Sequence, residues 1–244
     1  MDSVEIFVLV ALPYLAISCF VIGVIYRFSL WFRAHFAANA FTIFPGVESR
    51  GKLAFEIAKE VTTFSRIFKV EKKLWIGAWL LHFGLLMALI GHTCLVLEWT
   101  LLWDVLSLDS ETRDNIAQIS GALAGIVILS ALIYLLSRRF KGPMFQTSNV
   151  EDYFALALLL VIGLTGLAIR FVEHVELELF REYLGDLLLF RMPTEAPELS
   201  FYFLIHFLTV MLLIAVLPFT KLFHLGGIFV TLRLTNVRLP EGQS

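Results

Sequence analysis

Residues 74–97 read LWIGAWLLHFGLLMALIGHTCLVL, without a single Asp, Glu, Lys or Arg. About 20 apolar residues in a row are enough to cross the hydrocarbon core of a bilayer as a helix. The same stretch carries two histidines, His82 and His92, at a depth where an ionisable side chain needs a compensating partner or a function. It therefore predicts a transmembrane helix, and the two histidines are candidates for a functional site.

The rest of the chain has the same character. Of the 244 residues, 59% are hydrophobic and 16% are charged, with a mean hydropathy of +0.83, whereas a soluble domain is nearer half apolar and a quarter charged. Segments this long cannot be barrel strands, which need only about 9–11 residues. We expect an all-α membrane bundle in a single domain, 1–244. Its five transmembrane helices are predicted at about 4–28, 74–98, 114–137, 152–172 and 200–224.

The basic residues predict the orientation. The loop 33–73, the turn 138–151 and the tail 225–244 lie on one side of the predicted topology. All but four of the 19 Lys and Arg residues fall on that side. The exceptions are Arg113, Arg170, Arg181 and Arg191. Because basic residues are retained in the cytoplasm, the N-terminus is expected outside and the C-terminus inside. The protein is thus expected as a multi-pass protein of the cytoplasmic (inner) membrane.

The cytoplasmic loop 33–73 contains apolar residues at three- and four-residue spacing: Leu53, Ile57, Val61, Phe64 and Phe68. This spacing predicts an amphipathic helix, with Lys52, Lys59, Arg66 and Lys69 among its polar positions. Two interpretations are open for it. The helix lies on the membrane surface, or it docks a cytoplasmic partner.

The histidines carry the predicted chemistry. His82 and His92 are ten residues apart, about 15 Å of helical rise, a reasonable separation for two stacked haems. His206 and His224 are 18 residues apart, which is five helical turns, so a regular helix would present both on one face. The two helices are expected to be antiparallel, which pairs His82 with His224 near the cytoplasm and His92 with His206 nearer the outside. Neutral imidazole is a common ligand of haem iron, so the pattern predicts two bis-histidine haem b groups.

One mismatch remains in this scheme: 18 residues span about 27 Å against about 15 Å for ten. Pro218 could bend or end the helix before His224. His35 and His174 are expected to be surface residues. The two cysteines, Cys19 and Cys94, form no C-x-x-C motif, which excludes a c-type haem attachment or a cysteine-ligated cluster within the chain.

These residues resemble a known family. The stretch from Leu81-His82 to Gly91-His92, together with His206 and Leu217-Pro218 up to His224, is similar to the gamma subunit of respiratory nitrate reductase. It also resembles DsrM, the cytochrome b subunit of the membrane complex associated with dissimilatory sulfite reductase. The resemblance extends over nearly the whole chain, and loop 33–73 is closer to DsrM.

The resemblance implies a five-helix dihaem cytochrome that oxidises menaquinol, or a similar quinol, near His92. It further implies electron transfer to a cytoplasmic iron–sulfur subunit, further membrane and outer-side subunits as partners, and a role in respiratory or sulfur metabolism. A family lysine at the quinol site corresponds to Arg113, and Gly91 lies beside the outer haem ligand. An arginine keeps its charge, so Arg113 could donate a hydrogen bond to a quinone but could not accept its proton. It could equally be an interfacial anchor.

The other function classes that remain open are a gamma subunit of a nitrate-reductase-type complex, a small-solute transporter or proton channel that uses intramembrane histidines, and a passive membrane anchor. The spans contain no paired carboxylates and no inverted repeat, which disfavours a transporter. Whether the subunit is itself an enzyme, and in which direction electrons flow, stays open. Nothing in the sequence indicates a nucleic-acid partner.

Overall fold

The computed structural model describes residues 2–37, 50–94, 96, 100–173, 177–193, 195, 197–224 and 226–227, and every regular element in them is a helix. Five of these helices are long and apolar enough to cross a membrane, so the predicted all-α fold with five membrane helices is confirmed. The first consists of α1 (Ser3–Ile6), the π-helix η1 (Phe7–Ala11) and α2 (Leu12–Ala37). The others are α5 (Lys72–Thr93), α7 (Ser110–Arg139), α9 (Val150–Val172) and α11 (Phe201–Val216).

The last membrane helix differs from its prediction. Regular α11 ends at Val216 and continues as two short 3-10 turns, η2 (Leu217–Phe219) and η3 (Lys221–Phe223). Pro218 has no N–H to donate and its ring crowds the preceding turn, which accounts for the end of the helix. His224 therefore lies beyond the end of the regular helix that carries His206, and the prediction that one regular helix presents both on one face is wrong.

The connecting segments are also helical. The amphipathic segment forms α3 (Arg50–Thr63) and α4 (Ser65–Val70), which are separated at Phe64 by a left-handed φ of 49°. Three further helices were not predicted: α6 (Thr100–Val105), α8 (Gly142–Thr147) and α10 (Leu177–Leu188). His174 and most of the tail lie outside the described residues, and His35 belongs to α2.

The chain divides into two compact units, which we describe separately. Unit 1 contains residues 1–16 and 76–213, and unit 2 contains residues 17–75 and 214–244. Three helices, α2, α5 and α11, contribute residues to both units. The single domain expected from the sequence stays a prediction.

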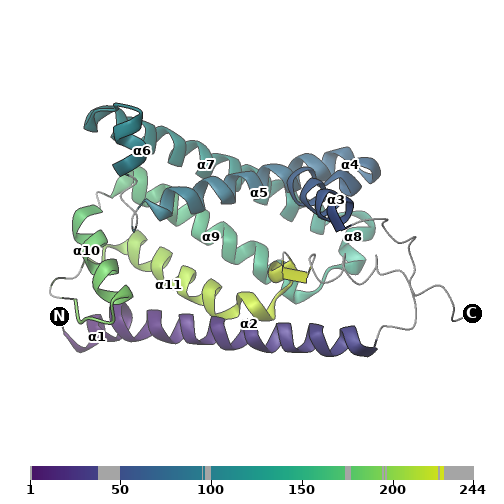
Figure 1. Ribbon diagram of the computed structural model, residues 1–244, viewed down its shortest axis with the longest axis horizontal. Helices are drawn as coiled ribbons and strands as arrows, with labels where there is room; N and C mark the ends of the chain where they lie inside the picture. Colours follow the sequence, from purple (N-terminus) through teal and green to yellow (C-terminus); the bar gives the residue numbers. More distant parts are fainter. Residues whose placement is uncertain are drawn as a thin grey trace, which may run out of the picture. The chain divides into compact units, whose positions relative to one another are not determined.

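In unit 1, glycines allow three helices to pack closely. On α5, a Cβ at Gly84 would lie only 2.8 Å from Ile128 of α7, and a Cβ at Gly77 would lie 2.5 Å from the Tyr134 ring. The residue numbers rise on α5 where they fall on α7, so the two helices are antiparallel. Helices α7 and α9 run side by side (Figure 1), and Gly125 of α7 makes room for Leu167 of α9. Small residues at helix contacts are typical of membrane proteins.

The unpredicted helix α10 completes the core of unit 1. Its Tyr183 is fully buried and donates a hydrogen bond of 2.6 Å to the carbonyl of Leu9 in the π-helix. Tyr14 of α2 in turn donates to the carbonyl of Leu187 at 2.8 Å. Phe203 and Phe207 of α11 join Leu9, Tyr183 and Leu187 in one buried cluster. Helix α10 therefore ties the first and last membrane helices of unit 1 together.

A polar network closes the turn between α7 and α9. Asp152 is buried and accepts from Arg139 at 3.2 Å, while Asn149 and Asp152 form a reciprocal cap at the start of α9. Tyr153 donates to the carbonyl of Arg139 at 2.9 Å. These contacts fix the antiparallel arrangement of the two helices.

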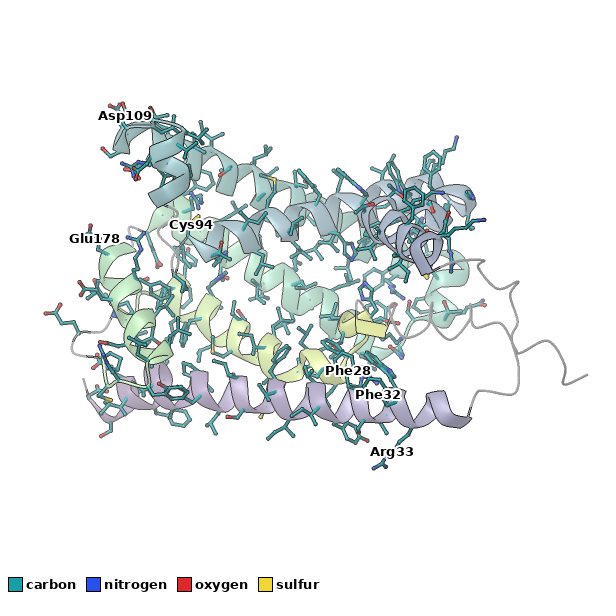
Figure 2. The ribbon with its side chains drawn as sticks, viewed as in Figure 1. Phe28, Phe32, Arg33, Cys94, Asp109 and Glu178 are labelled. Atoms are coloured by element: carbon teal, nitrogen blue, oxygen red, sulfur yellow. The ribbon has the colours of Figure 1, made fainter. Side chains whose placement is uncertain are left out.

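Unit 2 is built around aromatic packing. Phe28 of α2, labelled in Figure 2, makes edge contacts with Trp31 and Phe223, and Trp31 stacks on Phe223 at 5.9 Å. A Cβ at Gly23 would come within 2.8 Å of Pro218 and Phe219. The chain that carries His224 is thus packed directly on α2.

Candidate haem site

Four histidines were predicted to form two pairs, and the structure brings one of these pairs together within a single unit. The imidazole rings of His92, on the last turn of α5, and His206, on the second turn of α11, have centroids 6.4 Å apart. Their planes differ by only 12°. His82 belongs to unit 1 and His224 to unit 2, so the pairing of these two histidines stays a prediction.

The spacing of the two rings can be compared with the size of a metal centre. A nitrogen–metal bond of about 2.0–2.1 Å, plus about 1.1 Å from nitrogen to ring centre, gives about 6.3 Å between two rings that share one metal ion. The observed 6.4 Å agrees with this value. The distance between the two imidazoles is therefore compatible with both binding one metal ion.

Hydrogen bonds fix the tautomer of each histidine. Nδ1 of His82 lies 2.7 Å from the carbonyl of Ala78, and Nδ1 of His92 lies 2.7 Å from that of Ala88. Nδ1 of His224 lies 3.0 Å from the carbonyl of Lys221. A carbonyl can only accept, so Nδ1 carries the proton and Nε2 carries the lone pair. This is the arrangement that metal-binding histidines use, because the second hydrogen bond orients the ring and raises its basicity.

His206 is oriented by the neighbouring helix α9 rather than by its own. Its Nδ1 lies 3.1 Å from both the carbonyl of Ile162 and the hydroxyl oxygen of Thr165. A Cβ at Gly166 would come within 3.2 Å of the His206 ring. Ile162, Thr165 and Gly166 follow the three- and four-residue spacing of one helix face. That face of α9 holds the imidazole in place.

The donor set fits haem better than a bare metal ion. In the described part of the chain, no three His, Cys, Asp or Glu side chains come together as a possible metal site. Two histidines alone leave most of the coordination positions of iron unfilled, and a porphyrin supplies the four missing nitrogens. A Cβ at Gly91 would meet no atom of the described residues within 4 Å, so these residues leave the backbone beside His92 open on that side. The residues of the His92–His206 pair thus fit a bis-histidine haem.

Two further glycines, Gly84 of α5 and Gly121 of α7, allow close contacts between helices. Gly84 allows α7 to approach, and Gly121 of α7 lies under the guanidinium of Arg170, which a Cβ would meet. Gly91 is therefore the residue among these three with open space beside it.

In unit 2, Arg27 lies near the segment that carries His224. Its guanidinium carbon is 5.9 Å from the centroid of the Trp31 ring, and Trp31 stacks on Phe223, the residue before His224. Nε of Arg27 is buried and has no hydrogen-bond partner among the described residues. This segment is therefore packed beside a partly buried cation.

Arg113, the candidate quinol-binding residue, lies on the first turn of α7. Its side-chain Nε donates to the carbonyl of Asp109 at 3.3 Å, and Asp109 itself caps the helix by accepting from the backbone of Thr112. Asp109 and Cys94, the residue that follows α5, are labelled in Figure 2. The local hydrogen bond is consistent with an anchor and leaves other guanidinium donors for a ligand.

Two ionisable groups at this end of unit 1 were not predicted. Burial raises the pKa of the Cys94 thiol, and the charge of Arg181 on α10 partly offsets this. Burial also acts to raise the pKa of Glu173, but hydrogen bonds from Ser200, Tyr202 and Phe203 outweigh it and hold the pKa below its ordinary value. Glu173 thereby caps the N-terminus of α11, less than two turns from His206. The capping could not be predicted, because Glu173 and Ser200 are far apart in sequence.

The nitrate reductase gamma subunit family matches residues 55–236, which include the four candidate ligands His82, His92, His206 and His224. The chain belongs to this family. The membership agrees with the resemblance found in the sequence and places the chain among multi-pass membrane subunits of redox complexes.

Individual relatives extend the comparison. The chain is 29% identical to the Hdr-like menaquinol oxidoreductase cytochrome b-like subunit of Archaeoglobus fulgidus, over 90% of this chain and 76% of the relative. It is 30% identical to the nitrate reductase gamma chain of Bacillus subtilis, over 63% of this chain and 72% of the relative. It is also 31% identical to the nitrate reductase-like protein NarX of Mycobacterium tuberculosis, but spans only 26% of that protein.

Proposed function

We propose that this chain is a dihaem b membrane subunit that exchanges electrons between a menaquinone/menaquinol pool and a cytoplasmic iron–sulfur partner. The observation that carries the proposal is the His92–His206 pair, whose parallel rings are spaced for one iron atom. His82 and His224 are proposed as the ligands of a second haem. The name of the archaeal relative, a menaquinol oxidoreductase subunit, supports a quinol-dependent redox complex.

The chain's own residues hold and orient the redox centre. Haem, when bound, supplies one-electron redox chemistry. His92 and His206 would bind it through Nε2, because both Nδ1 atoms form hydrogen bonds to the protein. The polarity and solvent access around these residues would tune the redox potential of a bound haem.

The outer end of unit 1 is the proposed quinol site. Gly91 offers open backbone next to His92, and Arg113 carries guanidinium donors on the first turn of α7. Arg113 is proposed to donate a hydrogen bond to a quinone oxygen. It cannot take up the proton that quinol releases, because a guanidinium stays protonated. That proton must pass to water or to another group.

The charge distribution supports the proposed orientation. Basic residues concentrate in α3, in α4 and in the α7–α9 turn, which are the proposed cytoplasmic segments. The protein is accordingly placed in the cytoplasmic membrane. The helices α3 and α4 are the proposed docking region for the iron–sulfur subunit, and further membrane and outer-side subunits would complete the complex.

The complex is proposed to serve sulfur metabolism, and a nitrate-reductase-type complex is the alternative. The alignment with the Archaeoglobus fulgidus relative extends over more of the chain than the alignment with the Bacillus subtilis gamma chain does. Mass spectrometry of the subunits that co-purify with the chain would distinguish the two, because each complex has a different catalytic subunit.

The test of the proposed function is the reduction of bound haem by a menaquinol analogue. Purified full-length protein should develop the reduced α-band of a b-type cytochrome when the quinol is added. Protein that lacks haem, and that instead conducts protons or a solute in vesicles, would establish a transporter. Haem that no quinol reduces would contradict the quinol-oxidising role and favour a passive anchor.

A further inference from the structure

Arg170 is an arginine inside a membrane helix that the proposed function does not use. It lies on α9 within the span Val150–Val172 and is partly buried. Its Nη1 donates to the carbonyl of Ala117 at 3.0 Å, to the carbonyl of Gln118 at 3.4 Å and to the side-chain oxygen of Gln118 at 3.0 Å. In the described part of the chain, no carboxylate lies within ion-pair distance of it. A cation at membrane depth is costly unless something compensates its charge.

The hydrogen bonds of Arg170 involve one nitrogen only. A guanidinium has five N–H donors, and the described residues accept from none of the three on Nε and Nη2. Two of these, the Nε–H and the nearer Nη2–H, point along one edge, the fork that matches the two oxygens of a carboxylate. The Nη2, Cζ and Nε atoms lie against Gly121 of α7, where a Cβ would collide with them. The Nη1 contacts therefore hold the side chain on α7 and leave a carboxylate-binding edge.

This edge is at the level of the His92–His206 pair. Arg170 is one turn along α9 from Gly166, which packs on the His206 ring, and helical side chains lean back toward the N-terminus. On the other side, Gly84 of α5 packs against Ala124 and Ile128 of α7. Because α5 and α7 are antiparallel, His92, two turns further along α5, lies opposite the part of α7 near Ala117–Gly121. Arg170 is bound to that same part.

We propose that Arg170 binds a propionate carboxylate of the haem held by His92 and His206. The inference rests on the proposed function and adds a positioning residue to it. The carboxylate would compensate the charge of Arg170, and the arginine would compensate the buried carboxylate. Haem propionates are the carboxylates that the proposed site itself brings to this level of the membrane.

The test is the rate at which this haem leaves the full-length protein for apomyoglobin, followed for the spectral component that the His206→Ala variant lacks. Arg170→Gln should speed its loss about tenfold or more, the effect of losing a charge-assisted pair. Haem dimethyl ester, which has no carboxylates, should leave the wild-type protein faster to a similar extent. In Arg170→Gln the ester should have little further effect, because the two changes remove the same interaction.

Two control variants separate this role from a structural one. Gln118→Ala loosens the Nη1 contacts but keeps the fork, so its haem loss should stay sensitive to esterification. Arg170→Lys keeps the charge with fewer donors, so its rate of haem loss should lie between those of the wild type and Arg170→Gln. This variant also provides the test if Arg170→Gln folds poorly.

The possible outcomes are distinct. Independent, multiplicative effects of Arg170→Gln and esterification would overturn the propionate contact while leaving the haem site itself intact. Unchanged haem loss in Arg170→Gln, with weaker quinol binding, would also overturn it and assign the fork to the quinone. A protein that binds no haem would overturn this inference and the proposed function together.

Discussion

The imidazoles of His92 and His206 lie nearly parallel, 12° apart, with centroids separated by 6.4 Å. They come from two different helices, α5 and α11, and each uses Nδ1 for a hydrogen bond to a backbone carbonyl. Their different surroundings lead to the first prediction. His92 bonds to its own helix, whereas His206 also has the Thr165 hydroxyl of α9 as an acceptor.

Thr165→Val should raise the midpoint potential of the haem bound by His206. The Thr165 hydroxyl donates to the carbonyl of Val161 at 2.8 Å, so its oxygen accepts from Nδ1 of His206. Removing an acceptor makes the imidazole less basic and stabilises the ferric state less. We expect a several-fold change in the reduction equilibrium by redox titration. Thr165→Ser keeps the hydroxyl and serves as the control; a valine variant with the serine variant's potential would contradict this role.

Gly91→Ala and Arg113→Ala test the proposed quinol site. Both variants should keep their haem but be reduced more slowly by a quinol analogue in stopped-flow measurements. Losing a charge-assisted hydrogen bond at Arg113 corresponds to about ten- to a hundredfold in affinity. Arg113→Lys should be milder, because it keeps the charge and a donor. Unchanged rates per haem in Arg113→Ala, combined with a lower membrane yield, would make Arg113 an interfacial anchor.

Glu173 should make the stability of the protein depend on pH. Its pKa lies below the ordinary value of 4.5, because hydrogen bonds from Ser200 and from the start of α11 outweigh the effect of burial. The ionised carboxylate therefore stabilises the fold fully above about pH 4.5, and this contribution is lost as the pH falls through the lowered pKa. Thermal unfolding in detergent should show the loss in the wild type and a weaker one in Glu173→Gln. Equal pH dependence in both would exclude the cap as its cause.

Gly84→Ala should destabilise the protein by about 1–3 kcal/mol, the usual effect of overpacking a well-packed contact. The new Cβ would lie 2.8 Å from Cγ1 of Ile128, which is itself buried. Gly91→Ala is the matched control on the same helix, because its Cβ would meet no atom within 4 Å. Unfolding in a denaturing detergent measures both, and similar stabilities would contradict the close contact between α5 and α7.

The sequence predicts the membrane fold well because transmembrane helices are defined by length and hydropathy alone. The start of α9 is predicted to within two residues, and the Asn149–Asp152 cap is a further sequence signal for it. The predicted last helix extends past the end of α11, but Pro218, which the sequence offers as a possible helix end, accounts for the difference. Helix α10 is missed, although Phe180, Leu184 and Leu187 at helical spacing would have indicated it.

The predicted site is recovered only in part from the sequence. Helix order and histidine spacing are enough to pair His92 with His206. The contributions of Thr165, Gly166 and Arg170 depend on how α9 is rotated about its axis, which its uniformly apolar neighbours do not specify. Arg170 is one of four arginines predicted on the outer side, and the sequence does not distinguish it from the others.

The most direct test of the account is a pyridine haemochrome assay of the purified full-length protein and its four single histidine-to-alanine variants. We expect two haem b groups per wild-type chain and one per variant chain. Redox titration should show that His92→Ala and His206→Ala lose the same component, and that His82→Ala and His224→Ala lose the other. One haem or none per wild-type chain, or loss of the same component in His82→Ala and His206→Ala, would contradict the dihaem site.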